Sequence, residues 1–309
     1  MARSGDVGVA GAPERGYWIG PLCAVVGVLG FSFKAILIKL AYAWSPIDAV
    51  TLLALRMIYA APMFAVMAML AARRPDAKPI SKRDWLALAW LGFIGYYLSS
   101  LLDFIGLQYI TASLERLVLF LYPTIVVVLS ALFLRRPITR KAVGALLLCY
   151  AGIGLVFWHD LKVTGDPAST ALGGALVFAS AVGYAIYLVG AGGVIARLGS
   201  LRFIALAMLI SAGFVIAQFV AMRPWSALAA PFRVQMLTLA MAIFSTVLPT
   251  WLIAESIRRV GANAASLVGS LGPVFTIGLG ALILGEPIHL VQLAGAALVL
   301  IGVVLVSRR

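Results

Sequence analysis

Ten long apolar stretches divide this chain, and they limit its possible folds more than any other feature of the sequence. Each is close to the roughly 20 residues that an α-helix needs to cross a bilayer. Unpaired backbone groups are costly in hydrocarbon, so only helices and closed β-barrels cross it. Continuous apolar runs such as Val143–Tyr150 lack the alternation of a barrel strand. We therefore predict an all-α membrane protein with helices at residues 17–40, 48–71, 85–108, 112–134, 142–158, 170–191, 202–222, 233–257, 262–284 and 288–306.

The composition agrees with an integral membrane protein. Hydrophobic residues make up 63% of the 309 residues and charged residues only 11%, whereas soluble domains are about 45–50% apolar and roughly 25% charged. Ten spans of about 21 residues leave about 100 residues for ends and loops, which excludes a separate soluble domain. The first span lacks a clear cleavage site, so we expect a retained helix and not a signal peptide. Cys23 and Cys149 lie in apolar runs and indicate neither a disulfide framework nor a metal site.

The lysines and arginines divide unevenly between the two sides of the predicted bundle. With the N-terminus inside, 17 of the 24 lie in inner segments and four lie outside, at Lys39, Lys162, Arg223 and Arg233. Cytoplasmic loops are rich in Lys and Arg. We therefore predict a multi-pass protein of the bacterial inner membrane with both termini in the cytoplasm. Because topology accounts for the net charge of +13, nucleic acid is not expected as a partner, and the lipid bilayer and a small-molecule substrate are.

An internal repeat appears at an offset of 150 residues. Ala112–Ile138 aligns without gaps on Ala262–Ile288, and 11 of the 27 positions are identical. We therefore predict a cytoplasmic tail (1–16), a first five-helix repeat (17–158), an outer linker (159–169) and a second five-helix repeat (170–309). Because five is an odd number, the second half enters from the opposite side, which makes the two halves inverted repeats. Such repeats are typical of secondary transporters, whose halves rock about a site near the membrane midplane.

The same plan resembles a known family. Phe31–Tyr42, Thr51–Met57, Leu114–Ala131 and Gly285–Ile288 are similar to stretches of the EamA-type ten-helix branch of the drug/metabolite transporter superfamily, and in particular of the YddG-type bacterial amino-acid exporters. The resemblance covers nearly the whole chain and implies efflux of small metabolites or amino acids. One departure is visible. The family usually has Gly-Glu before the proline that follows the fourth helix, where this chain has Arg135-Arg136, and only Gly285-Glu286 in the second half keeps the pair.

Charged residues inside the predicted helices are the sharpest sign of a functional site. Each costs about 2.5–3.5 kcal/mol at a helix centre, so they are expected to face inward and pair. All lie in the outer half of their helices, and they are Lys34, Arg56, Asp103, Glu115 and Arg116. One hypothesis is a site or gate for an anionic group, held by Lys34 or Arg56 while Asp103 and Glu115 orient these bases. The alternative is a closed salt-bridge network that only holds helices together.

Polar and aromatic residues at helical spacing extend the candidate path. The spacing places Tyr96, Ser99, Ser100 and Asp103 on one face of the third helix, and Glu115 with Tyr122 on one face of the fourth. Further candidates are Ser180, Tyr184, Tyr187, Trp251, Ser266 and Ser270. Hydroxyl groups and rings suit an amphipathic ligand, but small residues also serve close helix packing and tyrosine the interfacial belt. Glu255 is expected to pair with Arg258 or Arg259.

Two prolines stand at equivalent positions of the repeat. Pro123 and Pro273 are predicted to kink their helices in mid-span, either as symmetry-related gates or as fixed bends. Enzyme motifs, nucleotide-binding loops and cofactor motifs are absent from the sequence, and His159 and His289 fall at predicted outer loops. We therefore predict a non-enzymatic secondary transporter without a cofactor that exports small metabolites, with amino acids as the expected substrates, by alternating access. A drug or other metabolite carrier, a passive channel and an intramembrane enzyme are the alternatives. Proton exchange and facilitated diffusion both stay open, and a monomer suffices.

Overall fold

The described residues form helices joined by short connections. The computed structural model describes residues 18–75, 78–135, 139–163 and 166–307, and the side chains of residues 134, 163, 262–264, 266, 267, 306 and 307 lie outside this description. In chain order the elements are α1 (Ile19–Trp44), α2 (Ala49–Ala72), α3 (Lys82–Gly92), η1 (Phe93–Leu98), α4 (Ser99–Gly106), α5 (Ala112–Leu119), α6 (Tyr122–Leu134), α7 (Arg140–Val163), α8 (Pro167–Leu198), α9 (Ser200–Met222), η2 (Trp225–Leu228), α10 (Phe232–Ala242), η3 (Ile243–Val247), α11 (Leu248–Gly269), α12 (Gly272–Leu279), η4 (Gly280–Leu284) and α13 (Leu290–Ser307).

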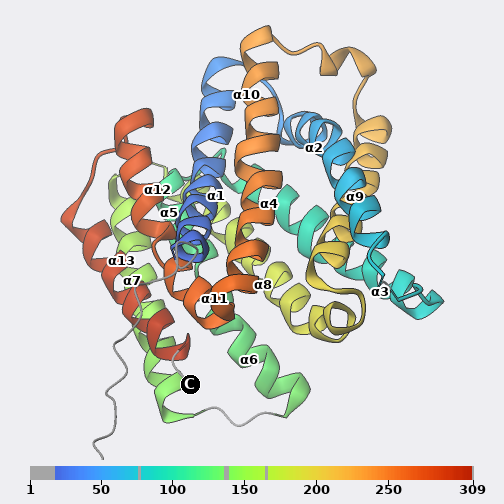
Figure 1. Ribbon diagram of the computed structural model, residues 1–309. Coiled ribbons are helices and arrows are strands. Elements are labelled where there is room, and N and C mark those ends of the chain that lie inside the picture. Colours follow the sequence, from blue (N-terminus) through green and yellow to red (C-terminus); the bar gives the residue numbers. More distant parts are fainter. Residues whose placement is uncertain (1–17, 76–77, 136–138, 164–165, 308–309) are drawn as a thin grey trace, which may run out of the picture.

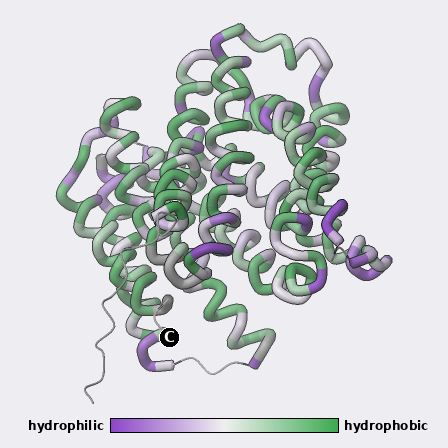
Figure 2. Tube along the Cα trace, in the orientation of Figure 1, coloured by the Kyte–Doolittle hydropathy of each residue, from purple (hydrophilic) through white to green (hydrophobic). Residues whose placement is uncertain are grey.

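These elements build the ten predicted transmembrane helices. In the described part of the chain, eight helices are long and apolar enough to span a membrane, and two shorter apolar helices, Gly272–Leu284 and Leu290–Leu305, complete the set. Some spans consist of several elements, such as Lys82–Gly106 and Phe232–Gly261. Figure 2 shows hydrophobic residues along most of the helices and hydrophilic residues gathered mainly at their ends and connections. The all-α, ten-helix membrane fold is therefore confirmed.

Several helix ends follow from local capping. The Asp48 carboxylate accepts hydrogen bonds from the Val50 and Thr51 amides and begins α2. Ser81 begins α3 through a reciprocal capping box with Asp84, and the Thr111 hydroxyl accepts from an amide in the first turn of α5. Such side chains satisfy amides that have no partner inside the helix. Around the predicted outer linker the helices reach further than expected, because α7 ends at Val163 and α8 begins at Pro167.

The internal repeat is visible in the backbone as well as in the sequence. The π-helices η1 and η3 begin at Phe93 and Ile243, 150 residues apart. The breaks between α5 and α6 and between α11 and α12 are separated by the same offset. Arg135 and Gly285, again 150 residues apart, both have left-handed backbone angles, with φ of 52° and 67°. The two halves therefore share local backbone distortions even at equivalent positions where their residues differ, such as Arg135 and Gly285.

The equivalent helices α7 and α13 pack directly against each other and run antiparallel (Figure 1). Gly152 of α7 approaches the backbone of Gly295 in α13. Nearer the start of α7, Ala145 lies against Gly302, nearer the end of α13. Residue numbers thus rise along one helix as they fall along the other. Two equivalent helices that run antiparallel are related by a two-fold axis perpendicular to both. The prediction of inverted repeats is therefore confirmed.

Both equivalent prolines lie at the start of a helix. Pro123 and Pro273 are each the second residue of a helix, α6 and α12, that follows a two-residue break. Proline has no amide to donate and suits the first turn of a helix. The prediction of a continuous helix kinked in mid-span was therefore wrong. The fourth and ninth spans are discontinuous, and each proline begins the second piece of its span.

Candidate functional site

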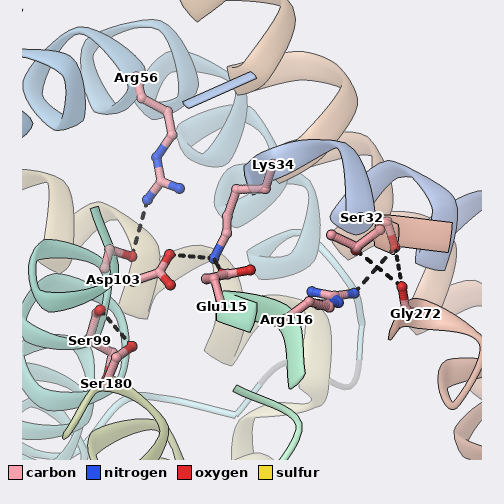
Figure 3. Close-up of polar contacts among 11 residues, drawn as sticks. Ser32, Lys34, Arg56, Ser99, Asp103, Glu115, Arg116, Ser180 and Gly272 are labelled. Carbon is pink, nitrogen blue, oxygen red and sulfur yellow. Dashed lines mark hydrogen bonds and ion pairs between the residues drawn. The ribbon is translucent and has the colours of Figure 1, made fainter. Parts of the chain in front are cut away.

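Three of the predicted charges meet at one point between α1, α4 and α5. The Lys34 ammonium lies 2.6 Å from Asp103 Oδ2 and 3.6 Å from Glu115 Oε1. The side chains of Asp103 and Glu115 are 2% and 0% exposed, whereas that of Lys34 is 19% exposed. Figure 3 shows Lys34 pointing between the two carboxylates. One lysine therefore faces two buried acids, as expected for intramembrane charges that must pair.

Arg56 of α2 is buried beside α4. Its guanidinium donates to the Ser100 hydroxyl at 3.2 Å and stacks over the Phe104 ring, 4.8 Å from the ring centroid. The residue is 4% exposed. It lies near enough to Asp103 to interact with it electrostatically, although no ion pair within 4.0 Å joins it to a carboxylate among the described residues. Arg56 is thus a buried cation held by a hydroxyl and a ring.

Arg116 points away from the acids, toward the second half of the chain. Its Nη2 lies 3.5 Å from the Ser32 hydroxyl oxygen. The guanidinium also lies against Gly272, the first residue of α12 (Figure 3). Within the described part of the chain no carboxylate oxygen lies within 4.0 Å of it. Arg116 therefore carries a charge that this structure does not neutralise by direct contact.

Lys34, Arg56, Asp103, Glu115 and Arg116 are called here the charged cluster. Several of its polar atoms have no hydrogen-bond partner among the described residues. They are Arg56 Nε, Asp103 Oδ1, Arg116 Nε and both carboxylate oxygens of Glu115. Buried polar atoms are nearly always hydrogen-bonded, and an unsatisfied one costs about 1–3 kcal/mol. The alternative of a closed salt-bridge network predicts satisfied partners throughout. The described contacts instead leave capacity for further polar contacts in the cluster.

Four tyrosines form a second group, called here the tyrosine cluster. The ring centroids of Tyr122 and Tyr184 are 5.3 Å apart, and those of Tyr184 and Tyr187 are 5.6 Å apart. The hydroxyls of Tyr96 and Tyr187 are 2.9 Å apart, within hydrogen-bond distance. Tyr96 and Tyr122 come from the first half and Tyr184 and Tyr187 from the second, so the cluster joins the two halves.

The predicted polar face of the third span is divided between different neighbours. Tyr96 lies in the tyrosine cluster, and the backbone carbonyl of Ser99 accepts a hydrogen bond from Ser180 of α8 at 2.7 Å. Ser100 and Asp103 face Arg56 and Lys34 instead. The four residues therefore contact different neighbours. The π-helix η1 lies between Tyr96 and the three residues of α4, and its wider turn changes the rotation of Tyr96 relative to them.

The predicted face of the fourth span does not hold together either. Glu115 lies in α5 beside Lys34, whereas Tyr122 begins α6 and packs against Phe120 and Tyr184. The break at Phe120–Leu121 separates these two pieces of helix. The i, i+7 relationship between Glu115 and Tyr122 therefore does not persist across it.

The remaining candidates have separate surroundings. Ser180 serves helix packing through its bond to Ser99. Trp251 is 46% exposed on α11, and Ser270 lies at the break before α12. The side chain of Ser266 is outside the described residues. Glu255 accepts from both Arg258 and Arg259, at 2.5–2.8 Å and 2.6 Å, so the expected pairing is confirmed.

Sequence reasoning missed the role of Glu286. Its carboxylate accepts from the Ala112 amide at 2.8 Å and from the Ser113 hydroxyl and amide at 2.8 Å and 3.3 Å. From the connection between η4 and α13 it therefore caps the first turn of α5, the helix that carries Glu115 and Arg116. The available signal was the Gly285-Glu286 pair, which only the second half retains, while Gly285 supplies the left-handed turn after η4.

Two cavities lie at the end of α1 near the α1–α2 connection. The larger, about 550 Å³, is lined by residues that include Lys39, Tyr42, Asp48 and Gln108. The smaller, about 130 Å³, also reaches Lys39 and extends to Asp160. The Lys39 ammonium donates to the Leu107 and Ile110 carbonyls. On the predicted topology this is the outer end of the bundle, and Lys39 stands one to two turns beyond Lys34 along α1.

Comparisons with known proteins agree with these features. The model of the EamA-like transporter family matches residues 18–158 and 171–308. The uncharacterized transporter YcbK of Bacillus subtilis (strain 168) is 30% identical over 285 residues, which cover 89% of this chain and 88% of that protein. An uncharacterized transporter of Archaeoglobus fulgidus is 25% identical over 298 residues, covering 94% and 99%.

A solved structure, described as "Crystal structure of protein", has the same fold. Its TM-score is 0.62 at 18% identity, and the match covers 93% of this chain and 95% of that one. At this identity the likeness concerns the fold alone. The family match spans nearly the whole chain and includes both halves. Taken with ten apolar helices arranged as inverted repeats, it establishes that this chain belongs to the EamA-like transporter family and is a multi-pass membrane transporter.

Proposed function

We propose that this chain is a secondary transporter of the bacterial inner membrane that exports small amphipathic metabolites, with amino acids as the expected substrates. The observation that carries the proposal is that both the tyrosine cluster and Arg116 of the charged cluster contact the two halves of the chain. The tyrosine cluster joins the two halves, and Arg116 reaches from the first half to Gly272 of the second. A ligand held there contacts both halves at once, which is the requirement for alternating access about an inverted repeat.

The chemistry of this region suits a ligand with polar and apolar parts. A cation lies next to an aromatic ring in the charged cluster, since the Arg56 guanidinium is 4.8 Å from the Phe104 ring centroid, and the tyrosine cluster supplies rings from both halves. Ligand sites combine apolar walls with a few placed polar groups in this way. Alternating access follows if the two halves rock about this region, with the discontinuous fourth and ninth spans changing their angles at the breaks.

Transport by reconstituted protein tests the proposal. Purified full-length chain in liposomes is expected to exchange radiolabelled L-amino acids across the bilayer with saturable counterflow. A panel of cationic dyes and other small metabolites, measured in parallel, examines the drug-efflux alternative. Ion conductance without saturation would instead indicate a passive channel, and chemical conversion of the added compound would indicate an enzyme. Repeating the counterflow with an imposed pH gradient separates proton exchange from facilitated diffusion.

Orientation is tested separately in cells. A reporter that is active only in the cytoplasm is expected to work when fused after residue 309. The same reporter inserted between Pro224 and Pro231, in the connection that holds η2, is expected to be inactive, because this connection is predicted to lie outside. The opposite pattern would reverse the predicted topology and with it the expected direction of export.

A further inference from the structure

The three cations of the charged cluster differ in how well they are neutralised. Lys34 lies within 4 Å of two carboxylates. Arg56 is 4% exposed and covered by the Phe104 ring, so a ligand has little access to it. Arg116 has neither a carboxylate within 4 Å among the described residues nor a covering ring. Two of the three bases therefore lack a directly paired carboxylate in the described structure, and Arg116 is the less buried of the two.

The surroundings of Arg116 leave room for its guanidinium. A Cβ on Gly272 would lie only 2.8 Å from Arg116 Nη2, so this position accommodates the guanidinium because it has no side chain. The equivalent position in the first half is Tyr122, so the two halves differ at this position. Ser32 is buried, and its hydroxyl lies 3.5 Å from the same nitrogen.

Two further features point to a ligand. Arg116 Nε is buried and has no hydrogen-bond partner in the described structure, so one donor of the guanidinium is unused. Tyr122 follows Arg116 by six residues, across the break that ends α5, and its ring packs against that of Tyr184. A guanidinium presents its donors in a planar fork that matches a carboxylate.

We propose that Arg116 binds the carboxylate of the transported substrate. This inference rests on the proposed transport of amphipathic metabolites and names the substrate class as organic monocarboxylates. The apolar part of the substrate lies against Tyr122 and Tyr184. Where the substrate also carries an ammonium group, the buried acids Asp103 and Glu115 supply the opposite charge. Lys34 stays paired with these acids and is not the carboxylate ligand.

Counterflow with matched compounds tests this assignment in the full-length chain. Each transported L-amino acid is compared with its carboxamide, which keeps the ammonium group and side chain but lacks the negative charge; L-leucine and L-leucinamide are the first pair. For the native protein the acid is expected to compete at least about tenfold better than the amide, the factor that corresponds to one charge-assisted contact. For Arg116→Gln this preference is expected to fall to about one.

Two further variants separate binding from folding. Gly272→Ala keeps the arginine and its charge but places a methyl group 2.8 Å from its guanidinium. It is expected to raise the half-saturating concentration of the acid at least about threefold while the protein remains folded. Arg116→Lys keeps the charge without the fork and is expected to fall between native and Arg116→Gln. Arg140→Gln, at the exposed start of α7, is the matched control and should retain the native preference.

The possible failures are distinguishable. If Arg116→Gln transports the acid with the native preference over the amide, the assignment of Arg116 is wrong and the proposed transporter stands. The same holds if native protein transports amides or amines but no carboxylate. If native protein exchanges no compound of the panel, the proposed function fails and this inference falls with it. Loss of the preference in Arg116→Gln and weaker binding of the acid by Gly272→Ala, with neither change in Arg140→Gln, support the assignment.

Discussion

Cys149 and Val299 are equivalent residues of the two repeats, 150 positions apart, and they contact each other. The Cys149 thiol lies 3.6 Å from the Val299 carbonyl oxygen and donates to it, and both residues are fully buried. A residue can meet its own repeat partner only close to the symmetry axis. The two-fold axis of the transporter therefore passes between α7 and α13 at this depth, and the close packing there holds the two halves in register.

Gly152→Ala is expected to disturb this packing. The added Cβ would lie 2.6 Å from the Gly295 carbonyl oxygen and 2.9 Å from Leu298 Cβ, so the helices must separate. Overpacking of this kind costs about 1–3 kcal/mol. Gly154→Ala on the same helix is the matched control, because nothing lies within 4 Å of its Cβ. Thermal unfolding of the purified protein in detergent should show a lower midpoint for Gly152→Ala alone, and equal midpoints would contradict this account of the axis.

Asp48 at the start of α2 predicts a dependence of stability on pH. Partial burial opposes its ionisation, but hydrogen bonds from Thr51 and Arg223 outweigh this effect, and the pKa of Asp48 is lowered below its ordinary 3.8. A lowered pKa means that the charge stabilises the folded state above about pH 4 and that this contribution disappears as the pH falls through the folded-state pKa. The Asp48 and Arg223 side chains are each 37% exposed, so the pair contributes no more than about 1 kcal/mol.

The test is Asp48→Asn, which keeps an acceptor for the helix cap and removes the charge. Its unfolding midpoint should lie slightly below that of the native protein at pH 7. The difference should shrink as the pH falls from 5 to 3, because the unfolded carboxylate takes up a proton over this range while the native one, with its lowered pKa, stays ionised to a lower pH. A difference that is constant over this range would show that the ionised form of Asp48 contributes nothing to stability.

Glu286 is expected to stabilise α5 through its first turn. Glu286→Gln removes the negative charge from a helix N-terminus and weakens three hydrogen bonds to Ala112 and Ser113. Charges in such partly buried positions contribute about 1–2 kcal/mol. The unfolding midpoint should fall, and transport should fall with it because α5 carries Glu115 and Arg116. Glu255→Gln, which removes a carboxylate from an exposed pair with Arg258 and Arg259, is the control and should change the midpoint less.

Much of the fold could be predicted because bilayer physics leaves few choices. The predicted fourth span, residues 112–134, has the same ends as α5 and α6 together. The repeat offset of 150 residues could be read from identities alone, and the inverted orientation followed from the odd number of helices. These features depend on the length and polarity of whole segments, which the composition of each segment determines.

The contacts within the site were harder to predict. The five charges were expected to share a depth, but depth does not decide which base meets which acid. That depends on the rotation of each helix, and η1 changes the rotation of α4 in a way that no local residue pattern indicates. The cap by Glu286 joins residues more than 170 positions apart, so no local rule could find it. The breaks before Pro123 and Pro273 could not be distinguished from kinks, because proline occurs at both.

Exchange of the charges of Lys34 and Asp103 tests whether this pair only holds α1 against α4. Lys34→Met alone should reduce the amount of folded protein in the membrane, because it leaves two buried acids without their cation and loss of one partner of a buried pair costs about 3–5 kcal/mol. The double variant Lys34→Asp/Asp103→Lys restores one opposite-charge contact and should recover part of that amount.

Transport by the double variant should not recover. The exchange places the ammonium on α4, which changes its position relative to Glu115. Glu115 directly precedes Arg116 in α5, so a change at this acid is expected to affect Arg116 as well. The measurement is initial counterflow per folded molecule, with folded protein quantified by size-exclusion chromatography of detergent extracts. Native rates in the double variant would mean that the pair has a purely structural role. A folded but inactive double variant would show that the pair takes part in transport. In that variant the ion pair between α1 and α4 is present, but the two charges do not have their native positions relative to the substrate.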